Sequence, residues 1–150
     1  MSYALSDAGN VAGCISAIAA ITGAAIAFVQ LRKLNASSQA ANLLKLRELL
    51  SPYDHIELKL RPHGEWQERD AKIKTARDAQ AFDKYAGLLE AGLLLIKERQ
   101  LDRGCFDEQF GYRIANIGAS SAAKARLKHE KTSWQTLISE LRRRGSWPSD

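Results

Sequence analysis

The residues in this sequence that are best suited to chemistry are basic side chains near its C-terminus. Between Ala119 and Asp150 there are seven Lys or Arg residues and three acidic ones, so this stretch holds +4 of the chain's formal net charge of +5. Arginine forms paired hydrogen bonds with phosphate oxygens, which suits a lipid head group, a nucleotide or a short oligonucleotide. We therefore predict an anionic-ligand site made of Lys124, Arg126, Lys128, Arg142, Arg143 and Arg144.

A structural role for the same residues is the alternative. Three consecutive arginines at a helix end favour the helix dipole and can hydrogen-bond the last carbonyls. Trp134 and Trp147 lie close to these basic residues in the sequence and could stack on bases, although Trp134 is also expected in the core.

Catalytic chemistry is not indicated. The sequence has no glycine-rich phosphate loop, no HExxH motif and no nucleophile elbow. The three histidines lie on charged or turn-like stretches, and Cys14 and Cys105 are too isolated for a disulfide framework or a zinc site. We predict a protein that is not an enzyme, with no catalytic residue, no metal and no cofactor.

A long uncharged segment precedes the charged part of the chain. No charged residue occurs from Ala8 to Leu31, and a helix of this length reaches about 36 Å, enough to cross a hydrocarbon core of about 30 Å. The N-terminal residues before it include no Lys or Arg, which argues against a signal peptide. We predict a transmembrane helix, with a buried helix of a soluble protein as the alternative.

Small and polar residues recur along this segment at steps of seven: Gly9, Ser16, Gly23 and Gln30. In a helix they share one side with several alanines, whereas isoleucines and Phe28 occupy the opposite side. Small residues let helices approach closely in a bilayer, and a polar stripe can line a water-filled path. This face predicts self-association, either around a pore or as a tight contact without a lumen.

Charge on either side of the segment predicts its orientation. Arg32 and Lys33 follow it directly, whereas only Asp7 precedes it. The positive-inside rule then places the N-terminus outside and the C-terminal part in the cytoplasm. We predict an N-terminal tail and transmembrane helix at 1–33 and a cytosolic helical domain at 34–150.

Apolar spacing predicts helices throughout the second part, and no run alternates long enough to be a strand. The first helix covers 34–50, with an apolar edge, and stops at Ser51–Pro52. A surface helix is expected over 65–84, a core helix up to Gln100 and a further helix at 106–117. The expected apolar faces are Leu43, Leu46, Leu49 and Leu50; Phe82, Tyr85, Leu89, Leu93 and Ile96; Phe106, Phe110, Ile114 and Ile117; and Trp134, Leu137, Ile138 and Leu141.

Several short motifs follow one another along the second part of the chain. They are Leu43–Leu49 (LLKLREL), Tyr85–Glu90 (YAGLLE), Leu101–Asp102, Phe106, Phe110–Ile114 (FGYRI) and Trp134. This order resembles a bacterial family of small single-pass membrane proteins with a helical cytosolic domain, among them the membrane effectors of Hailong anti-phage systems. The resemblance implies an oligomeric ion channel that is controlled by a DNA oligomer from a partner nucleotidyltransferase.

The combined prediction is an all-α, homo-oligomeric channel effector, a tetramer, in the bacterial inner membrane. Its partners would be the lipid bilayer and an anionic nucleotide or DNA oligomer bound at the cytosolic domain. One alternative is a single-pass anchor that conducts nothing and carries a helical protein-interaction domain. Another is a soluble helical bundle.

Overall fold

The computed structural model describes residues 29–31, 33–129 and 131–147. The chain divides into two compact units, Met1–Ser38 and Gln39–Asp150. In the first unit, residues 29–31 and 33–38 are helical and exposed. Every regular element in the described ranges is a helix, which confirms the all-α class.

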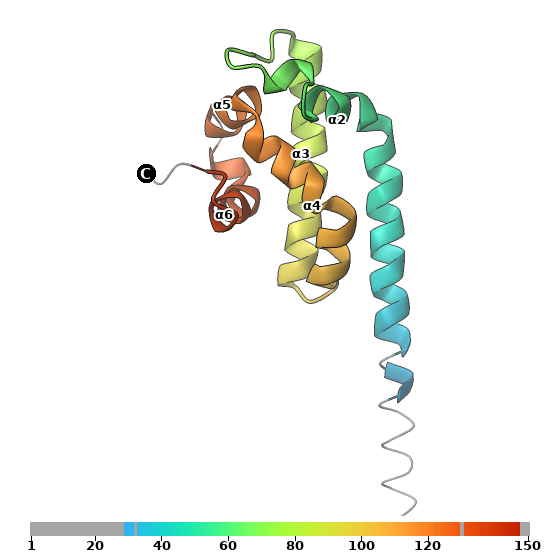
Figure 1. The fold of residues 1–150 in the computed structure, drawn as a ribbon. Helices are drawn as coiled ribbons and strands as arrows, with labels where there is room; N and C mark the ends of the chain where they lie inside the picture. The colour runs from blue at the N-terminus through green and yellow to red at the C-terminus, as the bar shows by residue number, and fades with distance from the viewer. Residues whose placement is uncertain (1–28, 32, 130, 148–150) are drawn as a thin grey trace, which may run out of the picture. The chain divides into compact units, whose positions relative to one another are not determined.

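The second unit contains helical residues 39–50 and a series of shorter elements. These are η1 (Ser51–Tyr53), α2 (Asp54–Leu60), η2 (Glu65–Gln67), α3 (Ala76–Lys97), α4 (Arg103–Ala119), α5 (Ser121–His129), η3 (Lys131–Ser133) and α6 (Gln135–Arg143). Helix α3 is the longest of them, and both α4 and α6 pack against it (Figure 1). The prediction that the first helix ends at Ser51–Pro52 is confirmed, since η1 begins there.

The core lies where the predicted apolar faces meet. On α3, α4 and α6 the side chains expected to be buried are buried, except that Ile96 is only partly covered. Polar side chains begin two of these helices. Thr75 accepts a hydrogen bond from the backbone N–H of Asp78 at 3.0 Å before α3, and Asp102 accepts one from Cys105 at 2.9 Å before α4. Such N-caps define where each helix starts.

Residues 39–50 present two different faces. Leu43, Leu46 and Leu50 are buried in the core, whereas Leu44 is 67% exposed. Leu49 was expected on the buried edge but is 43% exposed, so that part of the prediction is wrong. A helix turns by about 100° per residue, so Leu44 lies about 100° around the helix axis from Leu43, about 120° from Leu50 and about 160° from Leu46.

The surface helix expected over 65–84 does not form as predicted. Only Glu65–Gln67 and the part from Ala76 onward are helical. Side chains from other elements bind carbonyls at the start of this stretch: Ser120 Oγ donates to Trp66 O of η2 at 2.6 Å, and Ser121 Oγ lies 3.4 Å from Arg69 O in the segment that follows η2. These distant hydroxyls supply donors to two carbonyls that a continuous helix would pair with its own N–H groups.

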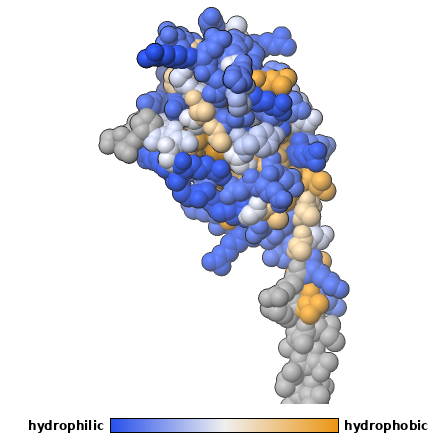
Figure 2. Space-filling view, viewed as in Figure 1, coloured by the Kyte–Doolittle hydropathy of each residue, from blue (hydrophilic) through white to orange (hydrophobic). Residues whose placement is uncertain are grey.

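The exposed surface is mainly hydrophilic on the face of the second unit drawn in Figure 2, with hydrophobic residues scattered among the polar ones. Among the described residues, no helix combines the length and the apolar character that a bilayer crossing needs. Residues 8–28 of the uncharged run lie outside the described ranges.

Two glycines of α3 allow a direct test of this packing. A Cβ at Gly92 would lie 2.6 Å from the ring of Phe106 and 2.9 Å from Leu46, whereas a Cβ at Gly87 would lie 3.7 Å from Trp134. We predict that Gly92→Ala destabilises the fold by about 1–3 kcal/mol through overpacking. Gly87→Ala is the matched control and should be neutral or stabilising, because alanine favours helices.

The measurement is the thermal unfolding midpoint of the full chain in one detergent, followed by circular dichroism. The Gly92→Ala midpoint should fall by about 5 °C or more. Equal midpoints for the two variants would contradict the close contact between α3, α4 and residues 39–50.

Candidate functional site

The predicted basic site is divided between two helices. Lys124, Arg126 and Lys128 lie on α5, and the three consecutive arginines lie at the end of α6. The environments of these six residues differ. A residue that already pairs with a carboxylate in the protein has less positive charge available for a ligand.

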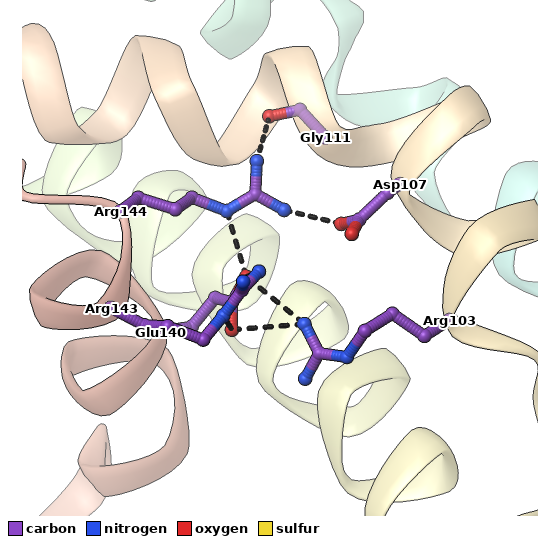
Figure 3. A network of polar contacts seen from close by, with 6 residues as sticks. All are labelled: Arg103, Asp107, Gly111, Glu140, Arg143 and Arg144. Atoms are coloured by element: carbon purple, nitrogen blue, oxygen red, sulfur yellow. Dashed lines mark hydrogen bonds and ion pairs between the residues drawn. The ribbon is translucent and has the colours of Figure 1, made fainter.

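A buried carboxylate organises the end of α6. Glu140 is 4% exposed, and three arginines surround it (Figure 3). Arg143 donates from Nε at 2.9 Å and from Nη2 at 2.6 Å, and Arg144 donates from Nε at 2.7 Å. Arg103 of α4 donates to the two carboxylate oxygens at 3.2 and 3.3 Å. The four side chains form one charge-assisted network.

Arg144 extends this network to α4. Its Nη2 donates to Asp107, and its Nη1 lies 3.4 Å from the carbonyl oxygen of Gly111 (Figure 3). Arg144 therefore contacts both α6 and α4 and holds these helices together. The observed contacts favour the structural alternative for Arg143 and Arg144, although the acceptors belong to Glu140, Asp107 and Gly111 rather than to the last carbonyls of α6.

The network changes the acidity of Glu140. Burial alone would raise its pKa, but the hydrogen bonds from Arg143, Arg144 and Arg103 outweigh this effect and lower the pKa from 4.5 to about 2. The carboxylate is therefore ionised throughout the neutral range, and its negative charge offsets part of the positive charge that the sequence concentrates here.

The three basic residues on α5 differ in the interactions they form. Arg126 forms a two-pronged ion pair with Asp83 of α3, at 2.9 and 2.6 Å. The Lys128 ammonium lies 5.9 Å from the centre of the Trp147 ring, a cation–π contact. Lys124 is half-buried and Lys128 is exposed, and no ion pair is seen for either lysine among the described residues. Anion binding by these residues stays a prediction.

The two tryptophans offer little ring surface for stacking. Trp134 is 8% exposed and Trp147 is 6% exposed. The expectation that Trp134 belongs to the core is confirmed. Trp147 also packs into the core, so neither ring presents an open face in the described part of the chain.

The predicted pore or packing stripe is represented by one described residue. Gln30 is helical and exposed, whereas Gly9, Ser16 and Gly23 lie outside the described residues. The stripe stays a prediction.

A second buried cluster was missed by sequence reasoning. Glu57 of α2 is 1% exposed, and it accepts from Arg61 at 2.7 Å and pairs with Arg113 of α4 at 2.7 Å. Arg113 also lies 5.8 Å from the centre of the Tyr85 ring, where burial raises the pKa of the Tyr85 hydroxyl. Local sequence patterns gave no signal for this cluster. Glu57, Tyr85 and Arg113 lie on three different helices, each 28 positions from the next, and only Arg61 is close to Glu57 in the sequence.

A cavity of about 560 Å³ lies beside this second cluster. The residues that line it come from the end of the helix at 39–50, from η1 and α2, and from α4: Arg47, Ser51, Asp54, Gln109, Tyr112 and Arg113, with Phe110. Arg47 and Gln109 are exposed, and no hydrogen bond or ion pair is seen for either within the described ranges.

No family model, curated protein or solved structure matches this chain. The resemblance to the Hailong effectors stays a prediction, and any function must be argued from the residues themselves.

The Glu140 network predicts a pH-dependent stability. Because the folded-state pKa is lower than the ordinary 4.5, the stabilisation is present above about pH 4.5 and is lost as the pH falls toward about 2. The difference corresponds to about 3 kcal/mol. We expect Glu140→Gln to lower the thermal unfolding midpoint at pH 7, because three arginines then lose an ionised partner.

The comparison that isolates Glu140 is the midpoint of the parent minus that of Glu140→Gln, measured from pH 7 down to pH 2. This difference should shrink below about pH 4.5. Glu108→Gln, at an exposed position of α4, is the control and should match the parent at each pH. A pH-independent difference would show that the ionised carboxylate is not what stabilises the fold.

Proposed function

We propose that this chain is a homo-oligomeric, single-pass protein of the bacterial inner membrane that conducts ions, and that its helical second unit controls conduction in response to an anionic ligand. In this proposal the N-terminus is outside and the second unit is cytoplasmic. The resemblance adds a biological setting, an effector of anti-phage defence whose ligand is a nucleotide or DNA oligomer made by a partner nucleotidyltransferase.

The proposal is carried by a series of residues at steps of seven positions, which ends at an exposed leucine. The register of Gly9, Ser16, Gly23 and Gln30 continues in the sequence through Ser37 to Leu44. Leu44 is 67% exposed, although three leucines near it are buried. An exposed leucine in such a register favours contact between identical helices, because each copy presents it at the same position.

The composition of the stripe supports a pore over a tight dry contact. Ser16 and Gln30 are polar, and polar residues inside a membrane face either another helix or water. A tetramer leaves room for a water-filled axis between four such stripes, and the small residues beside them allow the close approach that holds the helices together.

The second candidate function is an anchor without conduction. The observation that favours it is that the second unit has a hydrophobic core of its own, with Arg103 and Arg144 linking α4 to the end of α6. Such a unit could serve as a protein-interaction domain. A flux measurement separates the two candidates, since an anchor gives none at any protein concentration.

The test of conduction uses Gly23→Leu in the full chain reconstituted into liposomes. The added side chain would occupy the axis between copies, so we expect ion flux to fall to the level of empty liposomes while membrane insertion is unchanged. Ile18→Leu, on the bulky side of the same segment, should conduct like the parent. Flux that is equal in Gly23→Leu and the parent would refute a pore along this face.

The anionic-ligand site on α5 can be tested without disturbing Glu140. Lys124→Ala combined with Lys128→Ala should weaken binding of a short DNA oligomer by about tenfold, the effect of losing one or two phosphate contacts. Titration with fluorescently labelled oligomer at two salt concentrations measures it. Unchanged affinity in this variant would leave only structural roles for the basic residues of α5.

A further inference from the structure

The cavity lined by Arg47 and Arg113 has the size and the polar lining of a small-molecule site. Its volume of about 560 Å³ falls in the range of small-molecule sites, about 300–1,000 Å³. All its lining residues belong to the second unit, and they combine charged, amide, hydroxyl and aromatic groups.

Arg47 is the group with most freedom to bind a ligand. It is exposed, and among the described residues it has no acceptor. The arginines at the end of α6 differ in this respect, because Arg143 and Arg144 already donate to carboxylates. A guanidinium that has no acidic partner keeps its full set of donors for an anion from solution.

Arg113 of α4 lines the same cavity. Its side chain is 11% exposed and lies between Glu57, at 2.7 Å, and Asp54, at 3.3 Å. Glu57 also binds Arg61, so two arginines share this buried carboxylate. Asp54 is 61% exposed and makes the longer contact, and it is therefore the weaker of the two partners that compete with a ligand for Arg113.

The remaining lining groups suit a ligand that carries more than an anion. Ser51 and Gln109 supply exposed hydrogen-bond donors. Tyr112 is 46% exposed, so its ring adjoins the basic residues, whereas Phe110 is 3% exposed and offers no open ring face. Aromatic side chains stack on planar rings, whereas arginine binds phosphate.

We propose that this cavity binds a phosphate ester that carries a planar ring, of mononucleotide size, with Arg47 and Arg113 toward the phosphate and Tyr112 toward the ring. As a site for the anionic regulator it rests on the proposed function, but as a binding site it stands on the cavity alone. It differs from the site on α5 and α6 that the charge distribution of the sequence indicates.

The experiment measures binding of adenosine 5′-monophosphate to the full chain in detergent by isothermal titration calorimetry. Inorganic phosphate and adenosine are the two comparison probes. We expect saturable binding of the monophosphate, weaker binding of phosphate and the weakest binding of adenosine. Adenosine that binds as tightly as the monophosphate, or an absence of saturable binding by both phosphate-bearing probes, would overturn the proposal.

Three variants assign the binding to the cavity. Arg47→Ala should weaken the monophosphate affinity by about tenfold, the value of one charge-assisted hydrogen bond. Lys97→Ala removes an exposed positive charge from α3, away from the cavity, and should bind like the parent. Asp54→Asn should bind a few-fold more tightly, because Arg113 then loses a competing carboxylate.

The direction of the Asp54→Asn effect is the sharpest of these results, since a merely structural role for Asp54 cannot increase affinity. Equal affinities for Arg47→Ala and the parent, or an equal loss in Lys97→Ala, would overturn the assignment. These titrations measure no flux, so a negative result here leaves the outcome of Gly23→Leu unaffected, and the two proposals fail separately.

Discussion

The second unit depends on one buried carboxylate. Glu140 lies 4% exposed near the end of α6, where an ionised group without partners would be costly, and arginines from α4 and α6 supply the compensating charge. Because Arg144 also reaches Asp107 and the backbone of α4, the same ion pairs set the distance between the two helices. This charge balance stabilises the contact between α4 and the end of α6, beside the apolar faces that both helices present to α3.

These ion pairs change how the net charge counted from the sequence relates to the charge available to a ligand. A count over 119–150 gives +4, which suggests a basic surface. In the structure, Arg143 and Arg144 bind Glu140, and Arg126 binds Asp83, which lies outside the counted stretch. The count of +4 already includes Glu140, so it is the pairing of Arg126 with Asp83 and of Arg144 with Asp107, both outside the stretch, that lowers the positive charge open to a ligand. Arg47, by contrast, keeps its donors.

The sequence predicted those parts of the fold that local spacing decides. Apolar residues at steps of three and four identified the faces of α3, α4 and α6, and Pro52 marked the end of the first helix. It failed over 68–75, where Ser121 contacts the carbonyls of Glu68 and Arg69 from about 50 positions away, next to the bond from Ser120 to Trp66. The Glu57 cluster and the cavity were missed for the same reason, because contacts between distant segments leave no periodic trace in a sequence.

The helix that ends at residue 50 carries one residue from each of the two proposals. Leu44 and Arg47 are three positions apart, so they are neighbours on its surface, the first in the register of the N-terminal stripe and the second at the cavity. Its other side is fixed, since Leu43, Leu46 and Leu50 are buried. A ligand that binds Arg47 would therefore restrain the rotation and position of the surface that carries Leu44. Because three leucines of this helix are part of the core, two positions of the helix would also differ in core packing, and a ligand could regulate contacts between copies only by binding those two arrangements with different affinity.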